Sequence, residues 1–294
     1  RFGRCRMDES TLGCPKCVAL SACRGSTTAN TSILGEVPMT EVPMTEVSND
    51  KTPCARVDGR GVKQLRPVTI SPSYLNTVPG SALIEMGQTR VLCTVCLETR
   101  VPPWLAGSGR GWLTCEYGML PGSSPHRIAR ESATGRPNSR VREIQRLIGR
   151  SLRAIVDLDA LGERTLYVDC DVIQADGGTR TASITGAYVA LAQAIETLIR
   201  GGELDDDPLA GPLAAVSVGV VEGEVLLDLC YKEDSRAQTD MNVVMTAAGG
   251  IVEIQATAEG APFSRAESDQ MLDAAAEGIR QLLKFQSDAL EGTS

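Results

Sequence analysis

One short stretch of the chain changes its hydrophobic period from that of a strand to that of a helix. Residues 166–173 alternate between apolar and other positions, which predicts a β-strand whose buried face carries Leu166, Val168, Cys170 and Val172. Residues 182–200 are rich in Ala, Leu and Ile and predict a helix. Between them, Asp176-Gly-Gly178 tolerates turn geometry, and Thr179 and Thr181 offer hydroxyls that can cap a helix. The pattern therefore predicts a strand, a Gly-Gly turn and a helix.

This arrangement would place free backbone N–H groups, a helix N-terminus, two hydroxyls and the Arg180 guanidinium around one point. Such a combination binds phosphate. An ordinary turn with a solvated arginine is the alternative, since Asp-Gly-Gly is common in turns. The motif is not a Walker A loop, because no Gly-Lys followed by Ser or Thr comes after the glycines. The choice between a phosphate site and a plain turn depends on the rest of the chain.

The other periodic segments predict an alternation of sheets and helices. Four strands separated by Pro and Gly turns are predicted at residues 66–70, 82–86, 90–97 and 112–117. Residues 140–158 carry apolar side chains at helical spacing and predict a helix. Later strands are predicted at residues 213–221, 224–232, 241–246 and 251–258. A last helix is predicted at 264–288, where Ser264 and Glu267 fit a capping box. The order indicates an α+β fold (mixed α/β), with sheets packed against helices, rather than a doubly wound nucleotide-binding fold.

Residues 1–57 differ in composition from the rest of the chain. The pentad Glu36-Val-Pro-Met-Thr40 is repeated at once as Glu41-Val-Pro-Met-Thr45, a low-complexity pattern typical of disorder. Four cysteines at positions 5, 14, 17 and 23 match no established zinc spacing, so we expect unstructured thiols. We predict a disordered or low-complexity extension over residues 1–57 and one folded domain over residues 58–294.

Charge is distributed unevenly in a chain of 294 residues with a net charge of −8. Residues 100–153 contain ten Arg and three Glu, whereas residues 203–288 contain seventeen acidic and five basic residues. A basic segment inside an acidic protein indicates a localised polyanion site. Five of the ten cysteines lie in apolar, strand-like stretches, which favours reduced thiols and predicts a cytoplasmic protein. No apolar run approaches the length of a membrane span, so we expect no membrane partner.

Two carboxylates, Asp234 and Asp240, lie between two predicted strands, and Asp228 lies on the strand before them. Clustered carboxylates can hold Mg²⁺ or donate a proton, although a polar hairpin loop with solvated charges is the alternative. His126 is the sole histidine, and nothing beside it supports a catalytic triad. We expect it to be a surface residue.

Several motifs together closely resemble ribonuclease PH, from about Asp58 to the C-terminus. They are Asp58-Gly-Arg60, Gln64-Leu-Arg-Pro-Val68, Gly111-Trp112, Glu116-Tyr-Gly-Met-Leu-Pro121, Glu143-Ile-Gln-Arg-Leu-Ile148, the run from Asp169 to Gly186, and Asp240-Met-Asn-Val-Val-Met245. The resemblance implies the fold of the exosome ring subunits, similar to the ribosomal protein S-five domain-two-like fold, assembled in a hexameric ring. It also implies a phosphorolytic 3′→5′ exoribonuclease that trims tRNA precursors with inorganic phosphate and releases nucleoside diphosphates.

The resemblance assigns roles to particular residues. It implies that phosphate is held by Arg140, Gly178, Thr179 and Arg180. It implies that Asp234 and Asp240 bind Mg²⁺ and take part in catalysis, and that Arg127 and Arg130 contact RNA. The partners would be tRNA precursors and other RNA 3′ ends, in a homohexamer built as a trimer of dimers.

Two positions depart from the family pattern. Gly122 stands where the family has another RNA-contacting arginine, which predicts a weaker grip on tRNA, and Asn138-Ser139 replace a Gly-Gly pair before Arg140. A non-catalytic RNA-binding subunit of an exosome-type ring is the alternative function. A phosphate-binding enzyme for small molecules is a third, against which the basic segment argues.

Overall fold

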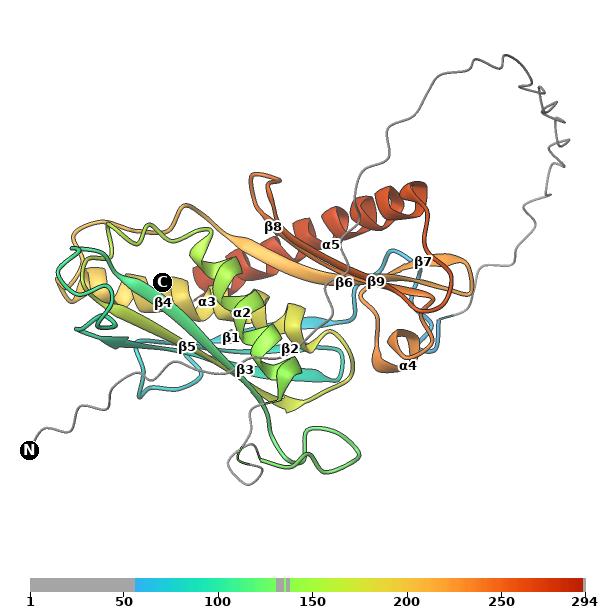
Figure 1. The fold of residues 1–294 in the computed structure, drawn as a ribbon, viewed down its shortest axis with the longest axis horizontal. Helices are drawn as coiled ribbons and strands as arrows, with labels where there is room; N and C mark the ends of the chain where they lie inside the picture. Colours follow the sequence, from blue (N-terminus) through green and yellow to red (C-terminus); the bar gives the residue numbers. More distant parts are fainter. Residues whose placement is uncertain (1–55, 131–134, 136–137, 293–294) are drawn as a thin grey trace, which may run out of the picture. The chain divides into compact units, whose positions relative to one another are not determined.

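The computed structural model describes residues 56–130, 135 and 138–292 (Figure 1). The repeats and the four cysteines considered for zinc lie outside these residues. The first described half forms a five-stranded sheet in the order β1-β2-β3-β5-β4, with β4 and β5 parallel and the other pairs antiparallel. Its strands are β1 (Val68–Pro72), β2 (Gly80–Met86), β3 (Thr89–Glu98), β4 (Trp112–Met119) and β5 (Thr165–Gln174).

The second half forms an antiparallel sheet in the order β7-β6-β8-β9. Its strands are β6 (Leu213–Val221), β7 (Glu224–Leu227), β8 (Thr239–Thr246) and β9 (Ile251–Ala258). All nine residues of β6 are buried, because α3 (Thr179–Arg200) and α5 (Arg265–Glu291) both pack on this strand. The predicted α+β fold is therefore confirmed, and Figure 1 shows α5 in red along β6.

Helix α3 forms the centre of the core. It contacts β2 and β3 of one sheet and β6 of the other, and its packing face carries small residues that allow close approach. A Cβ at Gly80 would collide with the Ala190 carbonyl oxygen, so the strand and the helix are nearly in backbone contact. By length and composition α3 could cross a membrane, contrary to our expectation, but 78% of its most apolar window is buried in the protein.

Two of the other helices begin at side-chain caps. In α2 (Ser139–Arg153) the Asn138 side chain accepts a hydrogen bond from the Arg140 N–H, which gives the unusual Asn138-Ser139 pair a structural role. The helix ends at Arg153, before the predicted end at 158. In α5 the predicted capping box is confirmed, because Ser264 and Glu267 bond reciprocally.

Two local predictions were wrong. The strand predicted over residues 224–232 ends at Leu227; Asp228 has a φ of 56°, and the chain then forms the short helix α4 (Tyr231–Asp234). Thr179 is not the cap of α3 either. Gly178 holds the N-cap position in left-handed geometry, with φ 63°, and Thr179 is the first helical residue. Glycine adopts such geometry without steric cost, so no side-chain cap was needed.

Candidate active site

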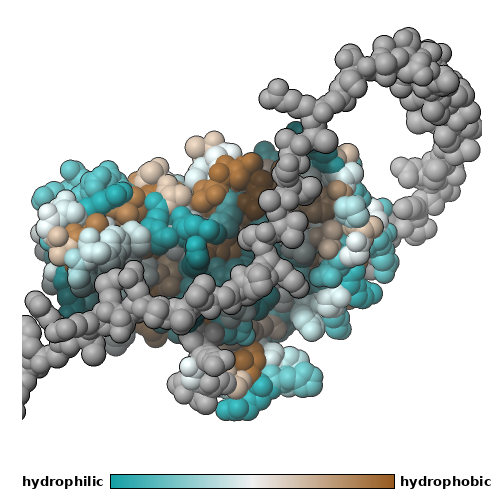
Figure 2. Space-filling model, in the orientation of Figure 1, coloured by the Kyte–Doolittle hydropathy of each residue, from teal (hydrophilic) through white to brown (hydrophobic). Residues whose placement is uncertain are grey.

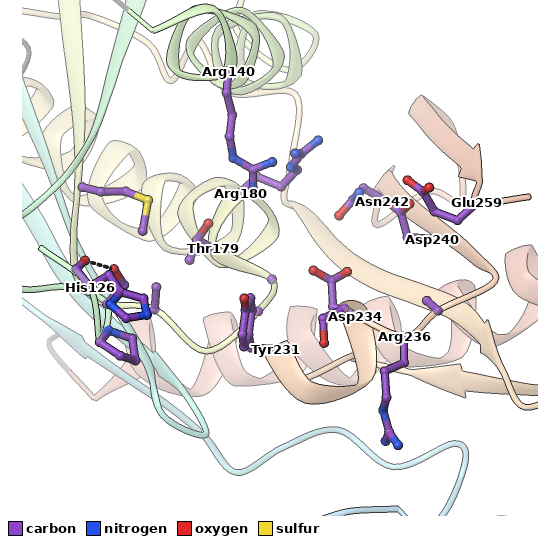
Figure 3. A pocket seen from close by; sticks show the side chains of 18 of the residues that line it. His126, Arg140, Thr179, Arg180, Tyr231, Asp234, Arg236, Asp240, Asn242 and Glu259 are labelled. Carbon is purple, nitrogen blue, oxygen red and sulfur yellow. Dashed lines mark hydrogen bonds between the residues drawn. The ribbon is translucent and has the colours of Figure 1, made fainter. Parts of the chain in front are cut away.

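A cavity of about 980 Å³ lies where the two halves of the fold meet. Its wall combines the Gly-Gly turn and the first turns of α2 and α3 with residues of α4 and β8. Figure 3 shows Arg140, Thr179 and Arg180 on one side of it, and Asp234, Asp240 and Glu259 on the other. The cavity thus joins the predicted phosphate residues to the predicted acids.

The Gly-Gly turn presents N–H groups to the cavity, because its carbonyl groups are engaged behind it. Arg66 Nη1 donates to the Asp176 carbonyl at 2.6 Å, the Thr89 hydroxyl to the Gly177 carbonyl at 2.7 Å, and the Thr181 hydroxyl to the Gly178 carbonyl at 2.9 Å. Within the described residues, the N–H groups of Gly178, Thr179 and Arg180 meet no protein acceptor. Together with the positive end of the α3 dipole, they form an anion cradle.

The Thr179 hydroxyl is fixed by a residue that the sequence reasoning missed. It lies 2.9 Å from the Tyr117 hydroxyl, and both side chains are buried. Since a hydroxyl can donate and accept at once, this pair can orient one proton toward the cavity. The motif Glu116-Tyr-Gly contained Tyr117, but its spacing could not reveal the contact.

Two arginines supply the positive charge of the cradle. Arg140 lies in the first turn of α2 and lines the cavity. The Arg180 Nη1 atom donates to Gln255 of β9 and lies 3.4 Å from Glu143 of α2. Gln255 in turn donates to Glu143 at 2.5 Å. This chain of contacts, which sequence reasoning also missed, directs the guanidinium of Arg180 from both halves of the fold.

The two predicted acids lie on the opposite wall, Asp234 at the end of α4 and Asp240 near the start of β8. Asp234 lines an open cavity, but the surrounding protein still displaces part of the water around its carboxyl group, and this burial raises the pKa of Asp234. The charge of Asp240 raises the same pKa further. Burial likewise raises the pKa of Asp240, against the lowering effect of Arg180. A carboxyl with a raised pKa holds a proton more readily, which suits a general acid.

The same wall can take part in binding a magnesium ion. Asp234 and Asp240 offer carboxylates, and the amide of Asn242 also lines the cavity. Among the described residues, no three acidic, histidine or cysteine side chains come together as a metal site. Because Mg²⁺ commonly uses one or two carboxylates and completes its shell with water and substrate phosphates, the residues present fit this ion but not a metal held by protein alone.

Other predicted residues lie elsewhere. Arg127 and Arg130 are exposed in the loop after β4 and do not line the cavity. Their neighbour His126 is exposed, as expected of a surface residue, and it also lines the cavity. Asp228 was considered with the acids, but it is fully buried and accepts two hydrogen bonds from the Arg66 guanidinium, at 2.7 and 3.0 Å. A carboxylate paired in this way cannot serve as an acid or a metal ligand in the cavity.

The chain matches the model of the 3′ exoribonuclease family, domain 1, over residues 64–195, and that of domain 2 over residues 211–278. The two matches together span more than half of the chain, which therefore belongs to this family. The cavity lies between the two matched domains: the cradle belongs to the first and both acids to the second.

Solved structures share the fold. Rrp46 of rice (Oryza sativa) has 21% identity, with 80% of this chain and 100% of that chain covered and a TM-score of 0.65. The Archaeoglobus fulgidus exosome with RNA bound to the active site has 24% identity, coverage of 79% and 92%, and a TM-score of 0.68. An archaeal exosome core has 24% identity, coverage of 79% and 91%, and a TM-score of 0.63. At these identities the likeness shows the fold alone.

Proposed function

We propose that this protein is a phosphate-dependent 3′→5′ exoribonuclease that trims tRNA precursors and other RNA 3′ ends. The observation that carries the proposal is the cavity itself, in which an anion cradle faces two carboxyls with raised pKa values. Neither half is sufficient alone, because phosphorolysis needs one site for the attacking phosphate and another that assists the leaving oxygen.

In this reaction inorganic phosphate lies on the N–H groups of Gly178 and Thr179 and between the guanidinium groups of Arg140 and Arg180. One of its oxygens attacks the last phosphodiester in line, and the bond to the 3′ oxygen of the preceding nucleotide breaks. A nucleoside diphosphate leaves, and Asp234 or Asp240 gives a proton to the 3′ oxygen. The carboxylate that does not donate the proton would hold a magnesium ion, which would neutralise charge on the scissile phosphate.

The RNA would reach the cavity over Arg127 and Arg130, which are exposed and can contact phosphates of the strand. We also propose a homohexameric ring of three dimers. Related solved structures are exosome assemblies, and apolar surface gathers in the upper part of Figure 2, where Figure 1 has β8 and α5. Exposed apolar side chains on neighbouring elements are Ile251, Ile254 and Phe285.

The decisive experiment incubates the purified protein with a tRNA precursor carrying a 3′ extension, with Mg²⁺, and with or without inorganic phosphate. We expect nucleoside diphosphates, formed only when phosphate is added. Monophosphates released by water alone would refute the phosphate assignment. RNA binding without any product under either condition would favour the alternative, a non-catalytic subunit of an exosome-type ring.

A further inference from the structure

Three arginines from residues 56–66 lie in a buried network of charges beneath the cavity. The side chain of Arg56 is fully buried, and those of Arg60 and Arg66 are 7% and 3% exposed. Their buried carboxylate partners are Glu233, with a side chain 2% exposed, and Asp228, with none exposed, and Arg60 also pairs with the partly exposed Asp58 at 2.6 Å. In Figure 1 this segment, in blue, lies beside β7 and α4. Burying charges costs much hydration free energy, so a buried ion-pair network is weak evidence of stabilisation. This network therefore indicates a role other than stability.

One end of the network holds α4. Arg56 donates to both oxygens of Glu233, at 2.8 and 2.6 Å, and to the carbonyl groups of Leu227 and Asp228, at 2.7 and 2.9 Å. The same carboxylate accepts a hydrogen bond from the Cys230 N–H at 3.1 Å, which completes the capping box of α4. Asp234 follows Glu233 directly, so the position of this acid depends on the contact with Arg56.

The other end holds the Gly-Gly turn. Arg66 binds Asp228 with its guanidinium and also with its backbone N–H, at 2.8 Å. A further arm of the same guanidinium donates to the Asp176 carbonyl at 2.6 Å, directly before the cradle. The Asp176 carboxylate accepts from the Tyr231 N–H of α4 at 3.3 Å, so the two ends also touch each other.

We propose that this network is a positioning device, which fixes Asp234 at one end and the phosphate cradle at the other end relative to each other. Arg56 and Arg66 are then positioning residues, since neither lines the cavity. The proposal rests on the proposed function. It adds that Arg56, which lies before both matched family domains and before the boundary predicted at residue 58, contributes to activity.

We expect different kinetic defects when the Arg66 end and the Arg56 end of the network are changed. In Arg66→Lys the charge can still meet Asp228, but the planar fork that also reaches the Asp176 carbonyl is lost. We expect the Kd of inorganic phosphate, measured by calorimetry without RNA, and the KM for phosphate to rise about tenfold, the typical effect of one lost charge-assisted hydrogen bond. The kcat value should change much less.

The variant Arg56→Met with Glu233→Met separates positioning from stability. Replacing both partners by apolar residues of similar size leaves neither charge of the pair buried without the other, which is the costly result of removing one alone. The carbonyl groups of Leu227 and Asp228 and the Cys230 N–H still lose a hydrogen bond, so we expect a lowered unfolding midpoint in a protein that remains folded at the assay temperature. We also expect unchanged phosphate affinity and a kcat lowered at least about tenfold, as when a reacting group is displaced by a fraction of an ångström. The matched control, Glu85→Met with Arg90→Met, removes a surface pair at 2.7 Å and should leave all three values unchanged.

Full kcat in a stably folded Arg56→Met and Glu233→Met variant would overturn the proposal, as would equal effects of the two ends on phosphate binding. Failure of the proposed function gives a different result, namely a wild-type protein that forms no nucleoside diphosphates. The phosphate Kd then still tests the Arg66 end, because calorimetry requires no turnover.

Discussion

Substituting Gly177 by alanine tests whether the turn must approach α4 as closely as the structure shows. Gly177 has a φ of 75°, and a Cβ there would lie 2.7 Å from the Leu229 carbonyl oxygen and 2.8 Å from the Tyr231 nitrogen. Both are backbone atoms, which cannot move aside as the end of a flexible side chain can. The turn or α4 would therefore have to shift, and the cradle with it.

Gly202 offers a matched control that isolates the cost of left-handed backbone geometry. It has a similar φ of 72°, but a Cβ would meet nothing within 4 Å. Left-handed geometry costs an alanine about 1–2 kcal/mol, of which roughly 0.4–1 kcal/mol is offset by the stiffer unfolded chain. Gly202→Ala should therefore lower the free energy of unfolding by about 1 kcal/mol. Forcing an extra methyl group into a packed site adds about 1–3 kcal/mol, so Gly177→Ala should cost about 2–4 kcal/mol.

Urea unfolding of both variants measures this difference, and calorimetry with inorganic phosphate measures its consequence for the site. We expect the phosphate affinity of Gly177→Ala to fall at least about tenfold, since one well-placed hydrogen bond to a charged group contributes about 1.5–3 kcal/mol. The affinity of Gly202→Ala should equal that of the wild type. Equal destabilisation by the two substitutions, with phosphate binding intact, would refute both the close approach and the placement of the cradle.

Four further outcomes follow from the site. Asp240→Asn keeps the shape but removes the charge, so turnover should fall by about a hundredfold or more with RNA affinity unchanged, as measured by single-turnover kinetics and filter binding. Arg180→Lys loses the planar fork and should mainly raise the KM for phosphate in steady-state assays. The raised pKa of Asp234 means that the native state binds its proton more tightly, so this contribution to stability is lost as pH rises above 3.8 through the raised value. We therefore expect the free energy of unfolding of Asp234→Asn, measured by urea titration, to rise relative to that of the wild type as the pH increases from 3.8 through the raised pKa of Asp234. Changing Arg127 and Arg130 to Ala should weaken binding of different RNAs alike and lower the salt slope by about 0.7 to 0.9 per lost phosphate contact; an effect limited to one sequence would instead indicate base readout.

Local patterns predicted much of the fold. The alternation in β5, the capping box of α5 and the glycines of the turn are local signals, because each depends on residues a few positions apart. The predicted limits of β6 and β9 are the observed ones. The cradle was predictable for the same reason, since a strand, a turn and a helix that follow one another in sequence create it.

Pairing between distant residues was not predictable from these patterns. Asp228 follows an apolar strand and reads as its continuation, but its partner Arg66 lies 162 residues away in sequence. This pairing ends the strand, bends the backbone into left-handed geometry and removes Asp228 from the set of candidate acids. Gln255 is similar, because its position in β9 gives no sign that Arg180 is its partner. Periodicity reports which face of an element is buried, and it does not report which charge a buried or half-buried group will meet.

The position of the cavity between two family domains explains why these distant pairs matter for the chemistry. The first domain carries positive charge and free N–H groups, and the second carries acids whose pKa values are raised. Phosphate bound in the cradle would bring negative charge toward those acids and raise their pKa values further, so phosphate binding and protonation of the acids favour each other. This coupling falls off with distance and is strong only if the two walls stay close. The contacts of Arg66 with Asp228, of Arg180 with Gln255 and of Tyr231 with Asp176 all cross from one half to the other. The motifs thus supply the reacting groups in each domain. The buried pairs hold the two walls together and so determine how strongly bound phosphate would shift the pKa values of the acids.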